Sequence, residues 1–173
     1  MQLTIQDAML FSLLLAAFYT DIKDMRIPNR LTFGGAGAGL VYHMAVGGWN
    51  GLTWSGLGLI AGFGLLLLLY FIGALGAGDV KLFASIGAIS GLPFVLHCLM
   101  YSIIYAGLIG LAILLVKKSW KNQASSFFCE LWVHFLLRRL DYLARFKERA
   151  NLRFPFMYAV LPAGITTWIN MTG

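Results

Sequence analysis

Residues 55–81, SGLGLIAGFGLLLLLYFIGALGAGDVK, join a long apolar run to a glycine-rich turn that carries an aspartate, Asp79. A helix needs about 20 consecutive apolar residues to cross the hydrocarbon of a bilayer. The run 55–75 reaches this length and contains no charged residue. The stretch therefore predicts a membrane-spanning helix that is followed by an acid at the membrane boundary.

The composition of the whole chain is that of a membrane protein. Of its 173 residues, 60% are apolar and 12% are charged, whereas soluble domains carry about 25% charged residues. Its 20 glycines suit helices that pack closely in lipid, where small residues let backbones approach one another. We expect an all-α, polytopic membrane protein that forms a single domain over residues 1–173.

About six apolar segments are expected to span the membrane. They cover roughly residues 4–20, 31–46, 55–75, 79–92, 94–116 and 154–172. In this arrangement all 13 lysines and arginines lie on one side, and loops rich in these residues stay in the cytoplasm. That side is predicted to be cytoplasmic, with both termini outside.

The connection between the fifth and sixth predicted spans, residues 117–153, is long and basic. Aromatic residues and leucines recur in it at spacings of one, three and four, and arginines and lysines are interleaved with them. This pattern is typical of an amphipathic helix on a membrane surface, with its basic residues near anionic lipid head groups. We expect a cytoplasmic insert that binds membrane lipid, and no nucleic-acid partner.

Two aspartates, Asp21 and Asp79, each lie where an apolar segment meets a polar loop. Ionisable residues at such depth are costly and mark functional sites by default. Asp21 ends the first predicted span and Asp79 begins the fourth, so both are expected at the cytoplasmic boundary. Two carboxyl groups that share a proton are sufficient for acid–base hydrolysis. The sequence does not determine whether these two spans are in contact.

The first motif, DIKDMRIPN at 21–29, has two interpretations. A proline disfavours helix in the residue before it, so the helix is expected to end before Pro28. Asn29 is expected to cap the next helix. The acids of the motif serve chemistry in one interpretation and only balance neighbouring cations in the other. Asp24 competes with Asp21 for the functional position, because residues three apart share a helical face.

The second motif, GAGDVK at 76–81, also has two interpretations. Gly76 and Gly78 permit a close backbone approach, so that an extended substrate can lie beside the acid. Asp79 can equally act as a helix cap and nothing more, because aspartate is a preferred capping residue. Neither motif is specific when it is taken alone.

The two motifs in this order resemble those of the type IV prepilin peptidase family, a branch of the Gly-x-Gly-Asp intramembrane aspartyl proteases. The resemblance is carried by residues 19–29, YTDIKDMRIPN, and by residues 76–81. Pro155 and Phe156, at the start of the last predicted span, resemble the closing Pro-Phe segment of the family. The resemblance to the family covers roughly residues 10–100 and the last predicted span.

The resemblance implies an enzyme that cleaves the short leader of pilin-like precursors at the cytoplasmic face of a prokaryotic inner membrane. It implies that Asp21 and Asp79 are the catalytic pair, and the family spacing to Pro28 favours Asp21 over Asp24. The flanking motif residues are expected to bind substrate or to form the active-site loop: Pro28, Asn29, Gly76, Gly78 and Lys81. No metal or organic cofactor is implied.

The chain differs from the larger members of that family. It shows no soluble N-terminal insert with paired cysteines, a feature that accompanies N-methylation in those members. No methyltransferase activity is therefore expected. The compact form is similar to the stand-alone peptidases of tight-adherence pili and of archaeal preflagellins.

Two other classes of protein stay open on sequence grounds. A small ion-coupled transporter would also place acids in its spans, nearer the midplane of the bilayer. A non-catalytic subunit for pilus or secretion assembly would use its glycine-rich spans only for helix association. Structural roles are expected for two further polar features. Thr4 and Asp7 have the spacing of a capping box, and His43 lies within a span as a buried, hydrogen-bonded histidine.

Overall fold

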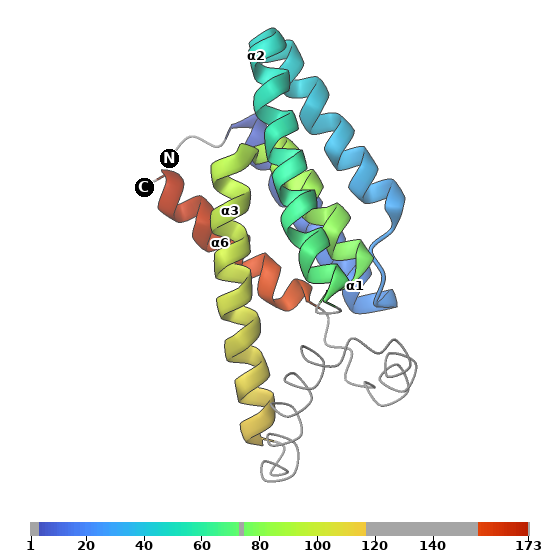
Figure 1. Cartoon of the computed structure of the whole chain (residues 1–173), viewed down its shortest axis with the longest axis vertical. Helices are drawn as coiled ribbons and strands as arrows, with labels where there is room; N and C mark the ends of the chain where they lie inside the picture. The colour runs from blue at the N-terminus through green and yellow to red at the C-terminus, as the bar shows by residue number, and fades with distance from the viewer. Residues whose placement is uncertain (1–3, 73–74, 117–155, 173) are drawn as a thin grey trace. The chain divides into compact units, whose positions relative to one another are not determined.

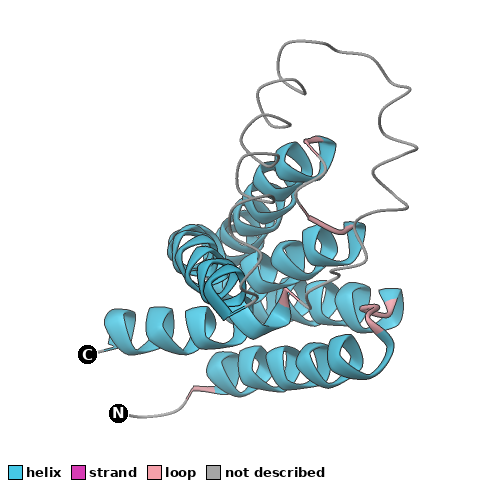
Figure 2. Ribbon diagram, turned by 90° about the horizontal axis from the view of Figure 1, so that it is seen from below, coloured by secondary structure: helices cyan, strands magenta, loops and turns pink. Residues whose placement is uncertain are grey.

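The computed structural model describes residues 4–72, 75–116 and 156–172. Figure 2 shows only helices, turns and loops in these residues. The helices are α1 (Ile5–Asp24), α2 (Asn29–Phe71), α3 (Ala77–Val116) and α6 (Met157–Thr172). The prediction of an all-α protein is confirmed.

Both ends of α1 are set by local hydrogen bonds. The Asp7 N–H donates to Thr4 Oγ1 at 3.3 Å, and the Thr4 N–H donates to Asp7 Oδ2 at 2.9 Å, which confirms the predicted capping box. At the other end Met25 is left-handed, with φ 50°, and its N–H donates to the Asp21 carbonyl. The helix therefore continues one turn beyond Thr20, where the first span was expected to end, and Asp21 lies inside its last turn.

Two long helices are each interrupted by one glycine. Gly48 in α2 has φ 56° and ψ −138°, and Gly91 in α3 has φ 81° and ψ 178°. Glycine adopts such positive φ values without the steric cost that other residues meet. Gly48 lies between the second and third predicted spans, and Gly91 lies at the end of the fourth. Figure 1 shows α2 turning back on itself as a helical hairpin.

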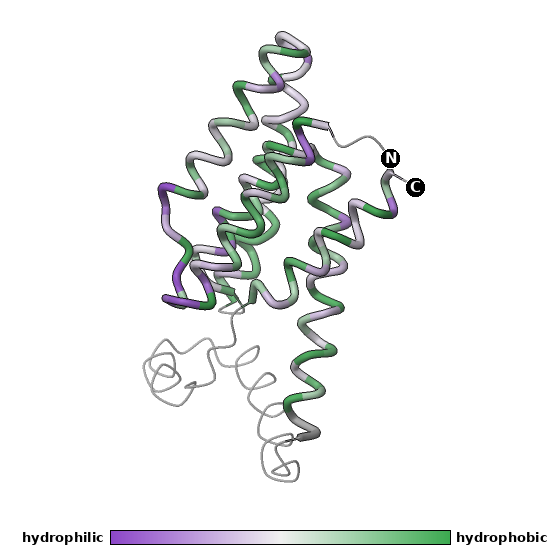
Figure 3. The backbone as a smooth tube through the Cα atoms, turned by 180° about the vertical axis from the view of Figure 1, so that it is seen from behind, coloured by the Kyte–Doolittle hydropathy of each residue, from purple (hydrophilic) through white to green (hydrophobic). Residues whose placement is uncertain are grey.

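Three of the described helices are long and apolar enough to cross a membrane, as judged by length and composition. They are α1, α2 and residues Ala77–Ile113 of α3. In Figure 3, apolar residues follow these helices, and hydrophilic residues gather at the loop between α1 and α2. The chain is an integral membrane protein. The count of six spans stays a prediction. It requires the segments before and after Gly48 in α2, and those before and after Gly91 in α3, each to cross the membrane separately.

The chain divides into two compact units, residues 1–106 with 155–173 and residues 107–154. The first unit holds α1, α2, α6 and most of α3. A single domain over residues 1–173 stays a prediction. The basic segment 117–153 lies outside the described residues, and its amphipathic helix also stays a prediction.

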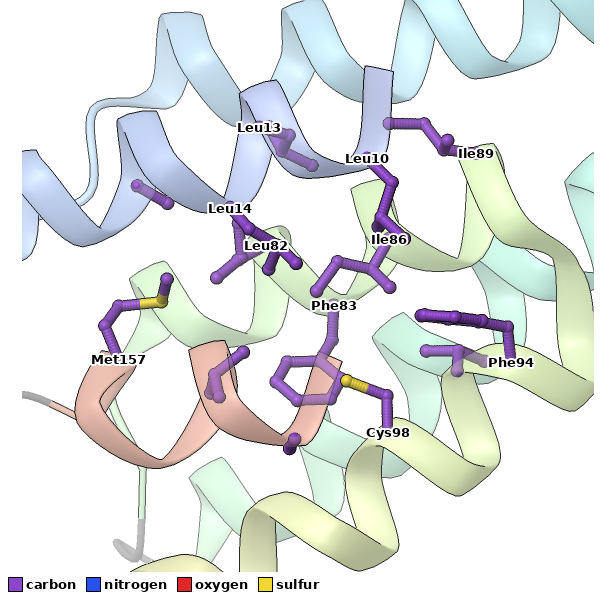
Figure 4. Close-up of a cluster of buried hydrophobic side chains, with 14 of the residues drawn as sticks. Leu10, Leu13, Leu14, Leu82, Phe83, Ile86, Ile89, Phe94, Cys98 and Met157 are labelled. Atoms are coloured by element: carbon purple, nitrogen blue, oxygen red, sulfur yellow. The ribbon is translucent and has the colours of Figure 1, made fainter. Parts of the chain in front are cut away.

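The first part of α3 is enclosed on all faces. Every residue from 82 to 89 is buried, and Phe83 has no exposed surface. A helix whose residues are buried on every face lies inside the helix bundle and not at its surface. Figure 4 shows leucines of α1, Met157 of α6 and Phe94 from beyond the glycine of α3 gathered around this segment. We call residues 77–90 the central segment; Asp79 lies in its first turn.

Glycines of α2 let both arms of its hairpin approach the central segment. A Cβ atom added at Gly39 would lie 2.7 Å from the carbonyl carbon of Ala88. One added at Gly58 would meet the Gly87 carbonyl and would lie 2.9 Å from the carbonyl carbon of Gly91. The predicted use of glycine for close helix packing is confirmed at these positions.

The far end of the central segment is held by polar side chains of α2. Pro93 has no N–H, so the Ile89 carbonyl lacks its usual donor four residues on. His43 Nε2 hydrogen-bonds to that carbonyl at 2.8 Å. Ser55 Oγ donates to the neighbouring Ala88 carbonyl at 2.6 Å. The prediction that His43 is hydrogen-bonded is confirmed, although the side chain is half-buried and not fully buried.

Candidate active site

The two motif aspartates come together in the first unit. Asp21 lies in the last turn of α1, and Asp79 lies in the first turn of α3. Gly78, the residue before Asp79, packs against Ile27 in the loop that follows Asp21, since a Cβ atom at Gly78 would lie 3.4 Å from Ile27 Cβ. The approach of the two acids, which the sequence did not determine, is therefore present in the fold.

Asp21 is a buried acid with a donor from a distant part of the chain. Its side chain is 8% exposed, and its Oδ2 accepts a hydrogen bond from the Met157 N–H at 3.3 Å. A buried carboxylate needs such donors, because burial of a charge without a hydrogen bond or partner is costly. The donor belongs to the first turn of α6.

Asp79 is half-buried and lies in the first turn of its own helix. Its Oδ2 accepts a hydrogen bond from the Gly76 N–H at 3.1 Å. The positive end of the α3 dipole also lies at this first turn and favours a negative charge there. Asp79 is the third residue of α3 and not its N-cap, so the capping interpretation was wrong in position, although its carboxylate does accept from the N–H of the residue before the helix. The same hydrogen bond fixes the orientation of the carboxyl group beside Asp21.

The remaining motif residues join the two motifs to each other. Lys81 Nζ donates to Asn29 Oδ1 at 2.9 Å, although the two residues are 52 positions apart. A Cβ atom at Gly78 would lie 3.4 Å from Ile27 Cβ, so this glycine packs against the loop after α1. In the structure, the residue that lies close to Gly78 is therefore Ile27 of the same chain, at a position where a substrate was expected. Gly76 donates its N–H to the Asp79 carboxylate.

One expectation about Asn29 was wrong. The N-cap of α2 is Pro28, which makes no side-chain capping bond, and Asn29 is the first residue inside the helix. Because it lies one position too late to cap, its side chain is available to accept from Lys81. The role of Asn29 is a contact between motifs and not a cap.

The structure separates the two acids that compete for the first position. Asp24 is exposed, whereas Asp21 is buried. Asp21 also accepts a hydrogen bond from the Met157 N–H in the interior of the first unit. These observations favour Asp21 as the partner of Asp79.

One participant in the site could not be found from the sequence. The Met157 N–H has no sequence signature, because every residue except proline carries the same group. The sequence feature closest to this donor is the Pro155-Phe156 pair, which directly precedes Met157. Among the residues for which the structure gives positions, no cluster of three or more His, Cys, Asp or Glu side chains could hold a metal ion.

The sequence matches known leader peptidases. Residues 8–115 match the type IV leader peptidase family. Over 122 residues the chain is 34% identical to the prepilin leader peptidase/N-methyltransferase of Bacillus subtilis (strain 168), a match that covers 67% of this chain and 47% of that protein. The chain thus spans about half the length of this curated relative. No solved structure matches the chain significantly. Because the family match covers more than half of the chain and includes both aspartates, the chain belongs to the type IV leader peptidase family.

Proposed function

We propose that the chain is a membrane aspartyl endopeptidase that removes the leader of type IV pilin-like precursors, with Asp21 and Asp79 as its catalytic residues. The observation that carries the proposal is the packing of the two motifs against each other, through Gly78 against Ile27 and the Lys81–Asn29 hydrogen bond, which brings Asp21 and Asp79 to one site. Each acid is also held by a backbone N–H. Membership of the leader peptidase family supports the reaction type.

The mechanism is general acid–base hydrolysis. One carboxylate removes a proton from a water molecule, which attacks the carbonyl carbon of the scissile peptide bond. The other carboxyl group, protonated, donates a hydrogen bond to the carbonyl oxygen and then a proton to the leaving amine. Two like charges at close range do not both form easily, so the pair titrates as a coupled unit. No metal or organic cofactor takes part in this scheme.

The site is placed by this proposal at the cytoplasmic face of a prokaryotic inner membrane, with both termini outside. The charge asymmetry of the sequence supports this orientation. Anionic lipids are the proposed partners of residues 117–153. N-methylation is not part of this proposal.

The proposal is tested with the full chain purified in detergent or reconstituted in vesicles, together with a pilin-like precursor. The expected product is a precursor shortened by its leader, with the new N-terminus identified by mass spectrometry. The Asp21→Asn variant serves as the inactive control. Failure of the folded chain to cleave any of several pilin-like precursors would refute the proposal and favour a transporter or an assembly subunit.

The Lys81–Asn29 contact gives a further prediction about the site. The contact is exposed, and exposed contacts of a charged group contribute up to about 1 kcal/mol, so its loss is expected to lower kcat about three- to fivefold. Lys81→Met, Asn29→Ala and the double variant are expected to show similar losses, because each removes the same contact. Kinetics of leader cleavage measure the three values.

The matched control for that experiment is Lys23→Met. Lys23 is exposed and lies over the Tyr19 ring, 6.0 Å from its centroid. Its removal is expected to leave kcat within about twofold, as for an ordinary surface substitution. Additive losses in the double variant of Lys81 and Asn29 would show that the two residues act independently.

A further inference from the structure

We propose that the first turn of α6 is a positioning element of the active site, in which the backbone N–H of Met157 holds the Asp21 carboxyl group in place beside Asp79. The inference rests on the proposed peptidase function and adds to it a third helix. The two motifs contribute α1 and α3, and neither contains this donor.

The contact is buried and joins distant parts of the chain. The Met157 nitrogen lies 3.3 Å from Asp21 Oδ2, across a separation of 136 positions. Met157 has no exposed surface, and Asp21 is 8% exposed. Water therefore does not readily replace the donor if it is removed, and an unpaired buried acceptor is expensive. The orientation of Asp21 thus depends on where α6 begins.

The position of Met157 in its helix explains why its N–H is available. The Phe156 carbonyl accepts from the N–H groups of Ala159 and Val160, at 2.9 and 3.2 Å, so the helix begins directly after Phe156. The N–H groups of the first turn have no partner within a helix. They also form the positive end of the helix dipole, which favours a carboxylate. The start of α6 therefore offers Asp21 a hydrogen-bond donor and a partial positive charge.

Two ring contacts join α6 to α1 at separate positions along the helices. Phe18 and Tyr158 make an edge-to-face ring contact near Asp21, with centroids 5.5 Å apart. Phe11 and Trp168 make a second one nearer the other end, at 5.4 Å. Edge-to-face pairs of this kind add stability beyond the area that they bury. Two contacts at different levels of the helices favour one alignment of α6 with α1, the one in which the Met157 N–H lies opposite Asp21.

Proline at residue 157 removes the donor with little other change. Proline is favoured at the first position of a helix, where its missing N–H has no intrahelical partner in any case. The residue before proline prefers the β region, which is also the usual conformation of an N-cap residue. Met157→Val is the matched control, because valine is close to proline in size and keeps the N–H.

The experiment compares kcat, KM and melting temperature for wild type, Met157→Val and Met157→Pro with a pilin-like precursor. Met157→Pro is expected to have a kcat about 10- to 100-fold below that of Met157→Val, the range for loss of a hydrogen bond to a charged group. KM is expected to be the same in both, since the N–H contacts Asp21 and not the substrate.

The outcomes separate this inference from the proposed function. Equal kcat values for folded Met157→Pro and Met157→Val would overturn the inference and leave the peptidase proposal intact. Absence of cleavage by wild type would overturn the peptidase proposal itself. If Met157→Pro has a lower melting temperature than Met157→Val, a second variant replaces it. In that variant an ester takes the place of the amide at residue 157, which removes the N–H and keeps the methionine side chain. An unchanged kcat in that ester variant would also overturn the inference.

Discussion

Asparagine in place of either Asp21 or Asp79 is expected to lower the rate of leader cleavage by about 1000-fold or more, within the range of general acid–base catalysis. Asparagine has nearly the size of aspartate and keeps a carbonyl oxygen, but it neither accepts nor releases the proton that the mechanism requires. Each acid performs one half of the proton transfer, so loss of either one stops the reaction. Cleavage kinetics with purified variants measure the effect, and melting temperatures establish that the variants fold.

The control for these variants is Asp24→Asn. Asp24 lies on the same helix as Asp21, three residues further along, but it is exposed. Its replacement is expected to leave kcat within about twofold, as for other surface positions. Cleavage that persists in Asp21→Asn and disappears in Asp24→Asn would transfer the catalytic role to Asp24.

Alanine at Gly58 is expected to lower the free energy of unfolding by about 1–3 kcal/mol, the usual cost of forcing extra atoms into a packed interior. The added Cβ would meet the Gly87 carbonyl and would lie 2.9 Å from the carbonyl carbon of Gly91. Both are backbone atoms, which cannot move aside as a flexible side chain does. The measurement is the melting temperature in detergent.

Gly56→Ala is the matched control for Gly58→Ala. The two glycines lie two positions apart in α2, and a Cβ at Gly56 would have no atom within 4 Å. Alanine favours helix over glycine by about 1 kcal/mol, so Gly56→Ala is expected to be as stable as wild type or more so. An equal loss of stability in both variants would show that the Gly58 contact is not the cause.

The helices could be predicted from the sequence better than their ends. Hydropathy placed the end of the first span at Thr20, where the polar residues begin. The helix continues to Asp24, because backbone hydrogen bonding is not interrupted by polarity and stops only at the left-handed cap, Met25. Since Asp21 thereby lies inside a helix, its backbone is fixed and its side chain has a defined direction.

The error at Asn29 has a similar cause. Asparagine after proline is compatible with a cap, but Pro28 occupies the N-cap position itself. A shift of one residue turns a capping side chain into one that points elsewhere. Its partner, Lys81, is 52 positions away, so no local pattern could identify the contact.

The sequence by itself determined the all-α class, the membrane setting and the two acids that mark the site. These are local properties, because apolar length, charge bias and short motifs are read from neighbouring residues. The tertiary structure alone decided that Asp21 and Asp79 approach each other, that Asp24 is exposed and that the Met157 N–H joins the site. These depend on how helices distant in the chain pack together. That packing follows from backbone contacts at glycines and from the enclosed central segment, which no short stretch of sequence encodes.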